Sequence, residues 1–214
     1  MNSRANKLDR SPLRLVPGGG ETREPTSDEE LIDAVQRGDH RITRLLYDRL
    51  YGVVDQTLYR VFGRREHDHD DLVQAAFEQI VLTLSRQSYA RACNLRTWAA
   101  SITSHVGFTA LRSRKRERKV VAREVSFDSS LVPTRTVAEN VAAASLELDR
   151  VRRHLLSMKP EQAETVFLHD VLGHQLAEVA LIMRVSIAAA TSRLVRGRRE
   201  LYRRIDADTK IRGE

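Results

Sequence analysis

The side chains best suited to contacting a ligand gather near the C-terminal end, in residues 187–203. The apolar residues Ile187, Ala190, Leu194 and Leu201 recur there at the spacing of one helical face. The hydroxyl and guanidinium groups fall largely off that face, where they could donate hydrogen bonds to base edges or to phosphates. These polar residues are Thr191, Ser192, Arg193, Arg196, Arg199 and Arg203.

A second group of side chains could bind a metal ion. Residues 66–71 read EHDHDD, and histidines and carboxylates are suitable ligands for zinc or a similar ion. However, these residues are adjacent in sequence, and no second cluster completes a ligand set. Acidic residues at the start of a helix also interact favourably with its positive end. We therefore interpret residues 66–71 as a helix start, and we expect no metal and no cofactor.

A helix-turn-helix would hold the C-terminal polar side chains in position. An apolar stripe in residues 173–184 is followed by a break at Val185 and Ser186, where the Ser186 hydroxyl can accept a hydrogen bond from the next helix. Two short helices joined by a tight turn, the second apolar behind and basic in front, are typical of this motif. Its second helix enters the DNA major groove. An ordinary helical hairpin with a solvated basic face is the alternative.

Composition favours an all-α intracellular protein with a polyanionic partner. The 214 residues are 41% hydrophobic, 30% charged and only 5% aromatic, which suits small helical domains better than a large sheet. The net charge of +7 favours an anionic partner. The single cysteine, Cys93, excludes an internal disulfide and suits a reducing cytosol. Because no signal peptide or membrane-spanning run is present, we expect a cytoplasmic protein without membrane contact.

Periodicity and turn residues predict two small helical domains joined by a flexible linker. Ser27 and Glu30 fit a capping box that begins the first helix, and Pro160 suits the first position of a later one. Between the domains, the helical periodicity lapses in a stretch containing serines and Pro133. The expected segments are a flexible N-terminal tail (1–26), a first domain (27–119), the linker (120–143), a second domain ending in the helix-turn-helix (144–205) and a C-terminal tail (206–214).

Two helices of the first domain carry candidate surfaces. The helix beginning near Asp71 has a polar face of Asp71, Gln74 and Glu78, which is either solvated or a docking face. The helix beginning near Leu95 ends in a basic run, residues 112–119, that could bind phosphates by releasing their counterions. Trp98 lies at helical spacing with an apolar residue, so we interpret it first as a core anchor.

The order of these pieces resembles the small extracytoplasmic-function sigma factors of bacterial RNA polymerase. Residues 71–77, DLVQAAF, resemble the family's D-L-V-Q-x-x-F helix, and residues 95–98, LRTW, with the basic run resemble its −10 recognition and melting segment. Residues 159–162, KPEQ, and the stretch 173–201 resemble its −35 domain, in which SRLVR at 192–196 matches S-R-L-x-R. The resemblance extends over nearly all of residues 27–201.

The resemblance implies a protein that catalyses nothing itself but binds core RNA polymerase and directs it to a class of promoters. The implied contacts with polymerase are the β′ clamp helices and the β flap, and members are commonly held by an anti-sigma factor, although no residue here identifies one. The implied sites are Asp71, Gln74, Phe77 and Glu78 for polymerase, Arg96, Trp98, His105, Arg112 and Arg114 for the −10 element, and the six polar residues of 191–203 for the −35 element.

Several positions depart from the family pattern. Arg184 stands at the turn where the family usually has Gly, which suggests either an unusual backbone or a slightly different path of the chain there. Residues 188–190 are all alanine, and His105 and Thr109 replace the common Asn and Asp. The promoter sequence therefore does not follow from the resemblance.

Three other functions compete with a sigma factor. The first is a helix-turn-helix regulator that binds DNA without polymerase, and the second is a degenerate sigma-like adaptor that binds proteins only. An enzyme is the third, but beyond the cluster at 66–71 no nucleophile, base or phosphate-cradling loop stands out.

Overall fold

The computed structural model describes residues 27–39, 41–89, 91, 93–124 and 139–212, and the regular elements in these ranges are all helical. The first group is α1 (Asp28–Gln36), α2 (Ile42–Phe62), α3 (His69–Ser85) and α4 (Leu95–Glu124). The second is α5 (Glu139–Ser157), α6 (Pro160–Val166), the π-helical turn η1 (Phe167–Val171), α7 (Leu176–Ile182) and α8 (Ile187–Arg212). The all-α prediction is confirmed for these residues, and none of the helices searched there is long and apolar enough to cross a membrane.

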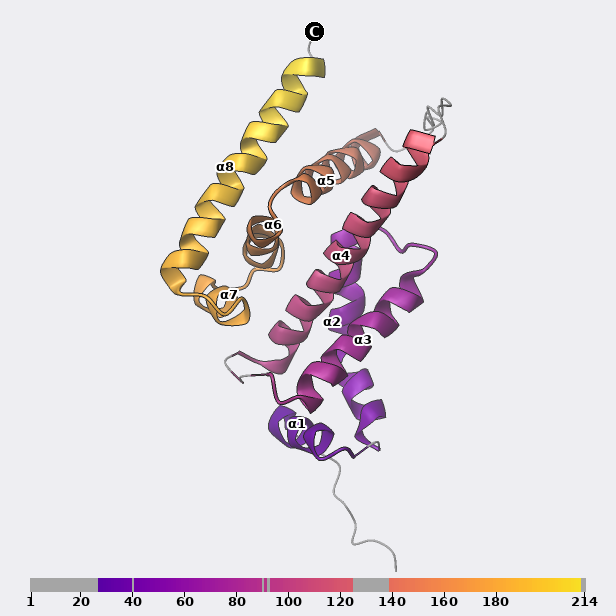
Figure 1. The fold of residues 1–214 in the computed structure, drawn as a ribbon, viewed down its shortest axis with the longest axis vertical. Coiled ribbons are helices and arrows are strands. Elements are labelled where there is room, and N and C mark those ends of the chain that lie inside the picture. The colour runs from indigo at the N-terminus through magenta and orange to yellow at the C-terminus, as the bar shows by residue number, and fades with distance from the viewer. Residues whose placement is uncertain (1–26, 40, 90, 92, 125–138, 213–214) are drawn as a thin grey trace, which may run out of the picture.

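The first domain is built around α4, the long helix that runs diagonally across Figure 1 with α2 and α3 packed beside its first half. This part of α4 carries small buried residues. Thr103 and Ser104 are buried, and each hydroxyl donates a hydrogen bond to a carbonyl oxygen of the preceding turn, so neither is left unsatisfied. Gly107 allows α2 to approach closely, because a Cβ there would lie 3.0 Å from Cγ1 of Val61.

The ends of the early helices follow from the sequence. The Ser27 hydroxyl accepts a hydrogen bond from the Glu30 amide, and the Glu30 carboxylate accepts one from the Ser27 amide, which confirms the capping box. Gly63 ends α2 with φ at +80°, a conformation that glycine adopts without steric cost.

The second domain places α8 against α6 and α7. Ala190 and Leu194 of α8 are buried there, as is Val179 of α7. The contact between α6 and α8 depends on Gly197, because a Cβ at this position would lie only 2.7 Å from Cγ2 of Val166. Pro160 stands in the first turn of α6, as predicted.

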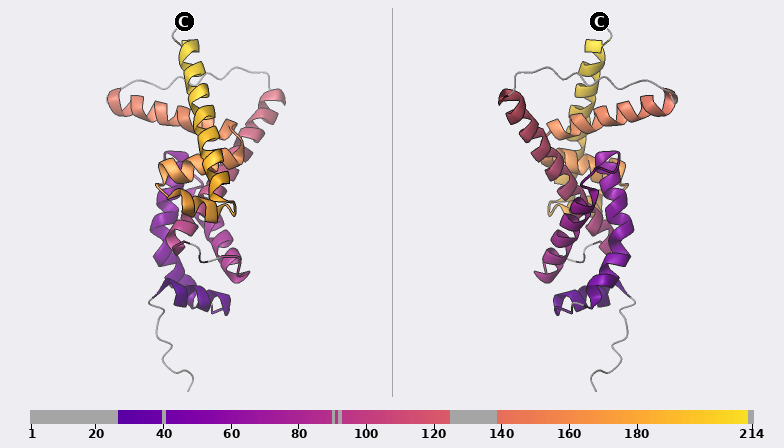
Figure 2. Two further views of the ribbon diagram at one scale, coloured as in Figure 1. Left: turned by 90° about the vertical axis from the view of Figure 1, so that its left-hand side faces the viewer. Right: turned by 90° about the vertical axis from the view of Figure 1, so that its right-hand side faces the viewer.

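The two domains pack against each other. The rings of Phe108 on α4 and Phe167 on η1 meet edge to face, with centroids 5.1 Å apart, and buried side chains form one cluster across both domains. In the side views the C-terminal part of α4 and the start of α5 splay to opposite sides of α8 (Figure 2).

Three boundaries differ from the sequence prediction. Helix α4 continues to Glu124 and α5 begins at Glu139, so helix extends into both ends of the predicted linker. Residues 122–124, Ala-Arg-Glu, are good helix formers, which agrees with the longer α4. Helix α8 continues to Arg212 through most of the predicted tail, and Asp208 there contacts α5, lying 3.7 Å from Nε of Arg150. The predicted N-terminal tail and residues 125–138 and 213–214 lie outside the described residues.

Candidate nucleic-acid interface

The turn between α7 and α8 has the tight geometry of a helix-turn-helix. The Ser186 hydroxyl accepts a hydrogen bond from the Ala189 amide at 3.1 Å, which caps the start of α8 as expected. Arg184 has φ at +54°, so the unusual backbone predicted there is confirmed. Its side chain donates a hydrogen bond to the Ser88 carbonyl oxygen of the first domain at 2.9 Å. A glycine, which the family usually has at this position, has no side chain to form this hydrogen bond.

The solvent face of α8 lies opposite its contacts with α6. Thr191, Arg196 and Arg199 are exposed, while Ser192 and Arg193 are half-buried. Ile187, Ala190, Leu194 and Leu201 were predicted to form the buried face. That prediction is wrong for Ile187, which is 57% exposed, because it lies at the helix start, beyond the cover of α6.

The arginines of α8 differ in what holds them. Arg203 forms two hydrogen bonds with the Glu200 carboxylate, at 2.9 and 2.8 Å, and Arg204 forms a third at 2.7 Å. Together these two arginines lower the pKa of Glu200 to about 2. Arg198 pairs with Asp170 of η1. Neither hydrogen bond nor ion pair joins the side chains of Arg193, Arg196 and Arg199 to other described residues, so these three can contact a ligand directly.

Sequence reasoning missed one residue on this face. Val195 is 50% exposed and lies next to Arg196, but it is apolar and so was not among the polar residues predicted to contact DNA. An exposed apolar side chain on a groove-reading helix can contact a thymine methyl group. The signal that could have found it is its position off the apolar stripe of α8.

On α4, two of the predicted DNA contacts meet a carboxylate of the other domain. Nδ1 of His105 lies 3.3 Å, and Nη1 of Arg112 lies 3.4 Å, from the same oxygen of Glu164 on α6. The hydrogen bond with Glu164 raises the pKa of His105. Burial alone would raise the pKa of Glu164. The hydrogen bond with His105 and the charges of His105 and Arg112 outweigh burial and lower the pKa of this carboxyl.

The other predicted contacts on α4 are placed differently. Arg96 is exposed. Trp98 is 8% exposed, and its ring lies 4.7 Å from that of Tyr89. This packing agrees with the core-anchor interpretation and leaves the indole unable to stack on a base in this arrangement. Arg114 pairs with Asp68 and lies 3.7 Å from an oxygen of Glu66, so its charge is already engaged.

Histidine and carboxylate side chains among residues 66–71 contact two different helices, α4 and α2. Ligand atoms of Glu66, His67 and Asp68 lie within 4.8 Å of one another, but Arg114 is paired with both carboxylates. Nε2 of His69 lies 2.8 Å from an oxygen of Asp55 on α2. The cluster therefore ties the start of α3 to α2 and α4, and the helix-start interpretation agrees with α3 beginning at His69.

The predicted polymerase face lies on α3. Asp71, Gln74 and Glu78 are exposed, and the Gln74 amide donates to the Glu78 carboxylate at 2.9 Å. Phe77 is half-buried, with its ring 4.7 Å from that of Tyr47 on α2. Tyr47, which sequence reasoning missed, is itself 39% exposed, so an aromatic pair borders the polar face.

Comparison with known proteins identifies both halves of this arrangement. The family model for Sigma-70 region 2 matches residues 46–117, and the model for Sigma-70, region 4 matches residues 148–201. The chain belongs to the sigma-70 family. Among curated sigma factors, SigW of Bacillus subtilis (strain 168), an ECF RNA polymerase sigma factor, is 22% identical over 179 residues, which cover 81% of this chain and 94% of SigW.

A second relative has a solved structure. The sigma factor CnrH of Cupriavidus metallidurans is 28% identical over 194 residues, covering 86% of this chain and 97% of CnrH. Its structure in complex with the cytosolic domain of CnrY superposes with a TM-score of 0.50 at 25% identity and covers 85% of this chain and 98% of CnrH. These relatives place the sigma factor in the extracytoplasmic-function (ECF) group.

The family assignment names each half of the molecule. In this sigma factor, region 2 includes most of α2, all of α3 and all but the end of α4. Region 4 runs from the middle of α5 to the middle of α8. Sigma factors are not enzymes, which agrees with the expectation from the sequence. The family works with core RNA polymerase and promoter DNA, and the helix-turn-helix of this chain lies within region 4.

Proposed function

We propose that this sigma factor recognises its promoters through the solvent face of α8 and the exposed side of α4, and that it holds core polymerase through the polar face of α3. The observation that carries the proposal is the set of arginines on α8, Arg193, Arg196 and Arg199, which follow a capped helix-turn-helix and have no carboxylate partner among the described residues. A guanidinium group without a partner can donate two parallel hydrogen bonds to guanine.

The residues of α8 are proposed to contact two different parts of the DNA, the bases and the phosphates. Arg196, Ser192, Thr191 and Val195 face the −35 major groove in this proposal, and they supply base contacts. Arg193 and Arg199 contact phosphates, which position the helix without specifying sequence. Arg203 is held by Glu200 and makes at most a weak phosphate contact.

On α4, Arg96, His105 and Arg112 form the −10 side of the proposal. Trp98 is left out because it lies in the core, and Arg114 because carboxylates of the α2–α3 corner hold it. Since Glu164 of region 4 pairs with His105 and Arg112, these two side chains must give up this contact to bind a promoter.

The polymerase contact is proposed for Asp71, Gln74, Phe77 and Glu78, extended by Tyr47. Polar groups around a partly exposed aromatic pair are the usual composition of a protein-binding surface. The β′ clamp helices are the proposed partner of this face, and the β flap is the proposed partner of region 4.

In vitro transcription tests the proposal as a whole. The purified chain is added to core polymerase lacking a specificity subunit, with fragmented host DNA as template, and start sites are mapped. We expect transcripts from a shared promoter class, and we expect Asp71→Arg to prevent holoenzyme assembly. A chain that binds promoter DNA but does not join the core enzyme would instead be a regulator that acts without polymerase.

An anti-sigma partner is a further part of the proposal. CnrH, which aligns with 85% of this chain, was solved with the cytosolic domain of CnrY. By analogy we assign this sigma factor a protein partner of the same kind, to be identified by affinity capture with the full chain.

A further inference from the structure

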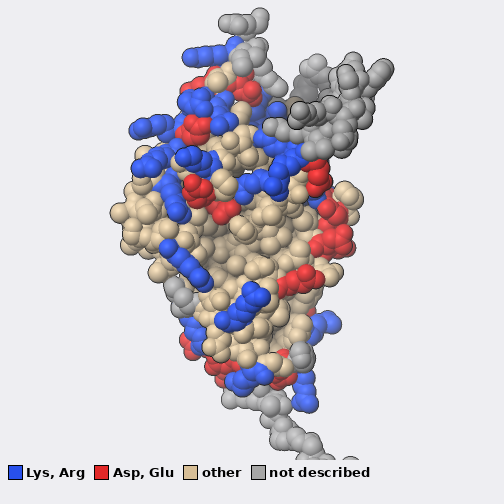
Figure 3. All heavy atoms as spheres, in the orientation of Figure 1, with Lys and Arg blue, Asp and Glu red and all other residues tan. Residues whose placement is uncertain are grey.

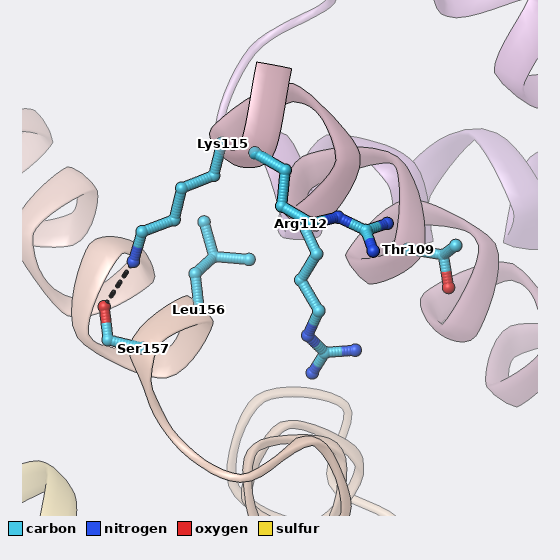
Figure 4. Close-up of a pocket in the computed structure, with 6 residues that line it drawn as sticks. Thr109, Arg112, Lys115, Leu156 and Ser157 are labelled. Carbon is cyan, nitrogen blue, oxygen red and sulfur yellow. Dashed lines mark hydrogen bonds between the residues drawn. The ribbon is translucent and has the colours of Figure 1, made fainter. Parts of the chain in front are cut away.

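A basic pocket lies where α4 of region 2 meets α5 of region 4. It has a volume of about 640 Å³ and is lined by Thr109, Arg112, Lys115 and Arg116 of α4 and by Leu156 and Ser157 of α5 (Figure 4). Three of these side chains are cationic and none is acidic. Lys and Arg side chains gather, with acidic side chains among them, on the upper half of the face shown in Figure 3.

The cationic groups of the pocket are fixed to different degrees. Nζ of Lys115 donates to the Ser157 hydroxyl at 2.7 Å across the boundary between the two regions. Arg112 is held by Glu164 through Nη1, and its guanidinium carbon lies 5.5 Å from the centre of the Phe108 ring. Both groups are therefore positioned by contacts with neighbouring side chains.

One donor in this pocket is left without an acceptor. Nη2 of Arg112 is buried, and no described residue accepts a hydrogen bond from it. A buried charged donor without an acceptor costs free energy, which a bound anion would recover. Arg116, one residue from Lys115, is exposed and forms no ion pair with a described residue. The exposed guanidinium group of Arg116 thus has unused donors, and Arg112 adds one buried, unpaired donor in a residue that lines the pocket.

We propose that this pocket binds a phosphate group. Guanidinium groups match the spacing of phosphate oxygens, an ammonium adds a point charge, and a hydroxyl adds a further polar contact. Because α5 supplies part of the lining, an occupied pocket joins region 2 to region 4. The phosphate can belong to a small polyphosphate or to the backbone of a nucleic acid strand. The proposal does not depend on promoter recognition, since binding requires only the folded chain.

Calorimetric titration of the full chain tests the proposal. One arm uses inorganic pyrophosphate, and the other uses a 12-nucleotide single strand at the same ionic strength. Arg116→Ala should weaken binding about tenfold, as expected for the loss of one hydrogen bond to a charged group. Ser157→Ala should also weaken binding. Arg118→Ala removes the same charge from an exposed position of α4 outside the lining, so it should leave the affinity within about twofold of wild type.

The outcomes separate the sources of phosphate. Pyrophosphate binding that follows this pattern identifies a small polyphosphate ligand, and the same pattern with the single strand alone identifies a nucleic acid backbone. Equal losses for Arg116→Ala and Arg118→Ala would overturn the proposal, because the basic helix would then attract anions without a site. Unchanged binding in Ser157→Ala would overturn the proposal that α5 contributes to the phosphate site. Circular dichroism of each variant confirms that it folds.

Discussion

The availability of an arginine for DNA depends on what already holds its guanidinium group. Arg203 is fixed on Glu200, whereas Arg196 is exposed and has no partner among the described residues. Arg196→Ala should therefore relax the preference at one −35 base by about 1–3 kcal/mol. Arg203→Ala should weaken binding by a smaller amount, and to the same extent for all sequences. Holoenzyme binding to promoters with each −35 base changed in turn measures both effects.

The assignment of Arg196 fails under one clear result. If Arg196→Ala and Arg203→Ala lowered affinity equally for every promoter variant, Arg196 would contact the DNA backbone and not a base.

Protonation of His105 controls part of the contact between the two regions. The pKa of His105 is raised by Glu164, so the stabilisation from this pair is fully present below about pH 6.5 and is lost as pH rises through the raised pKa. At the acid end, the pair weakens as pH falls through the lowered pKa of Glu164. NMR titration should give a pKa for His105 above 6.5 that returns toward its ordinary value in Glu164→Gln.

The matched control for this titration is Glu161→Gln, an exposed change on the same helix. An unchanged His105 pKa in Glu164→Gln would show that the ion pair does not form in solution. The Arg112–Glu164 contact persists at high pH, because the guanidinium group stays charged.

At the scale of the helices, the packing of α8 on α6 depends on one missing side chain. A Cβ on Gly197 would lie 2.7 Å from Cγ2 of Val166 and 3.1 Å from the Gln162 carbonyl oxygen. Gly197→Ala should destabilise region 4 by about 1–3 kcal/mol, because the added methyl group overpacks this contact. Urea unfolding followed by circular dichroism measures the loss.

The control for this change is Gly52→Ala in α2, where a Cβ meets nothing within 4 Å. Alanine favours helix over glycine, so Gly52→Ala should stabilise region 2 by about 0.5–1 kcal/mol. Unchanged or increased stability in Gly197→Ala would mean that α6 and α8 are not as closely packed as the structure shows.

Across the whole molecule, contacts between the two regions engage residues that we assign to promoter recognition. Glu164 holds His105 and Arg112, Phe167 packs on Phe108, and Arg184 bonds to the first domain. Loss of the Glu164 charge should therefore favour separation of the regions. We expect Glu164→Gln to have a larger radius of gyration by small-angle X-ray scattering and to bind promoter DNA more tightly in the absence of polymerase.

Glu161→Gln again serves as the control and should behave like wild type in both measurements. Identical scattering and DNA binding for wild type and Glu164→Gln would show that the ion pair does not restrain the two regions. Higher salt should reduce the difference between the proteins, because half-exposed ion pairs are screened.

The sequence by itself determined the helices, their order and the family. Hydrophobic periodicity marks helix faces, and Ser27, Ser186 and Pro160 mark helix starts, because these signals depend on neighbours within a few residues. The extension of α8 and the exposure of Ile187 were not predictable in this way, since both depend on which other helix lies alongside.

Only the tertiary structure decided which predicted site residues are available. Arg114 and Arg196 look equivalent in the sequence, yet one meets two carboxylates and the other meets none among the described residues. The meeting of His105 with Glu164 joins residues 59 positions apart. The physical reason is that ion pairing and burial depend on distance in space, and residues distant in sequence come together only when the helices pack.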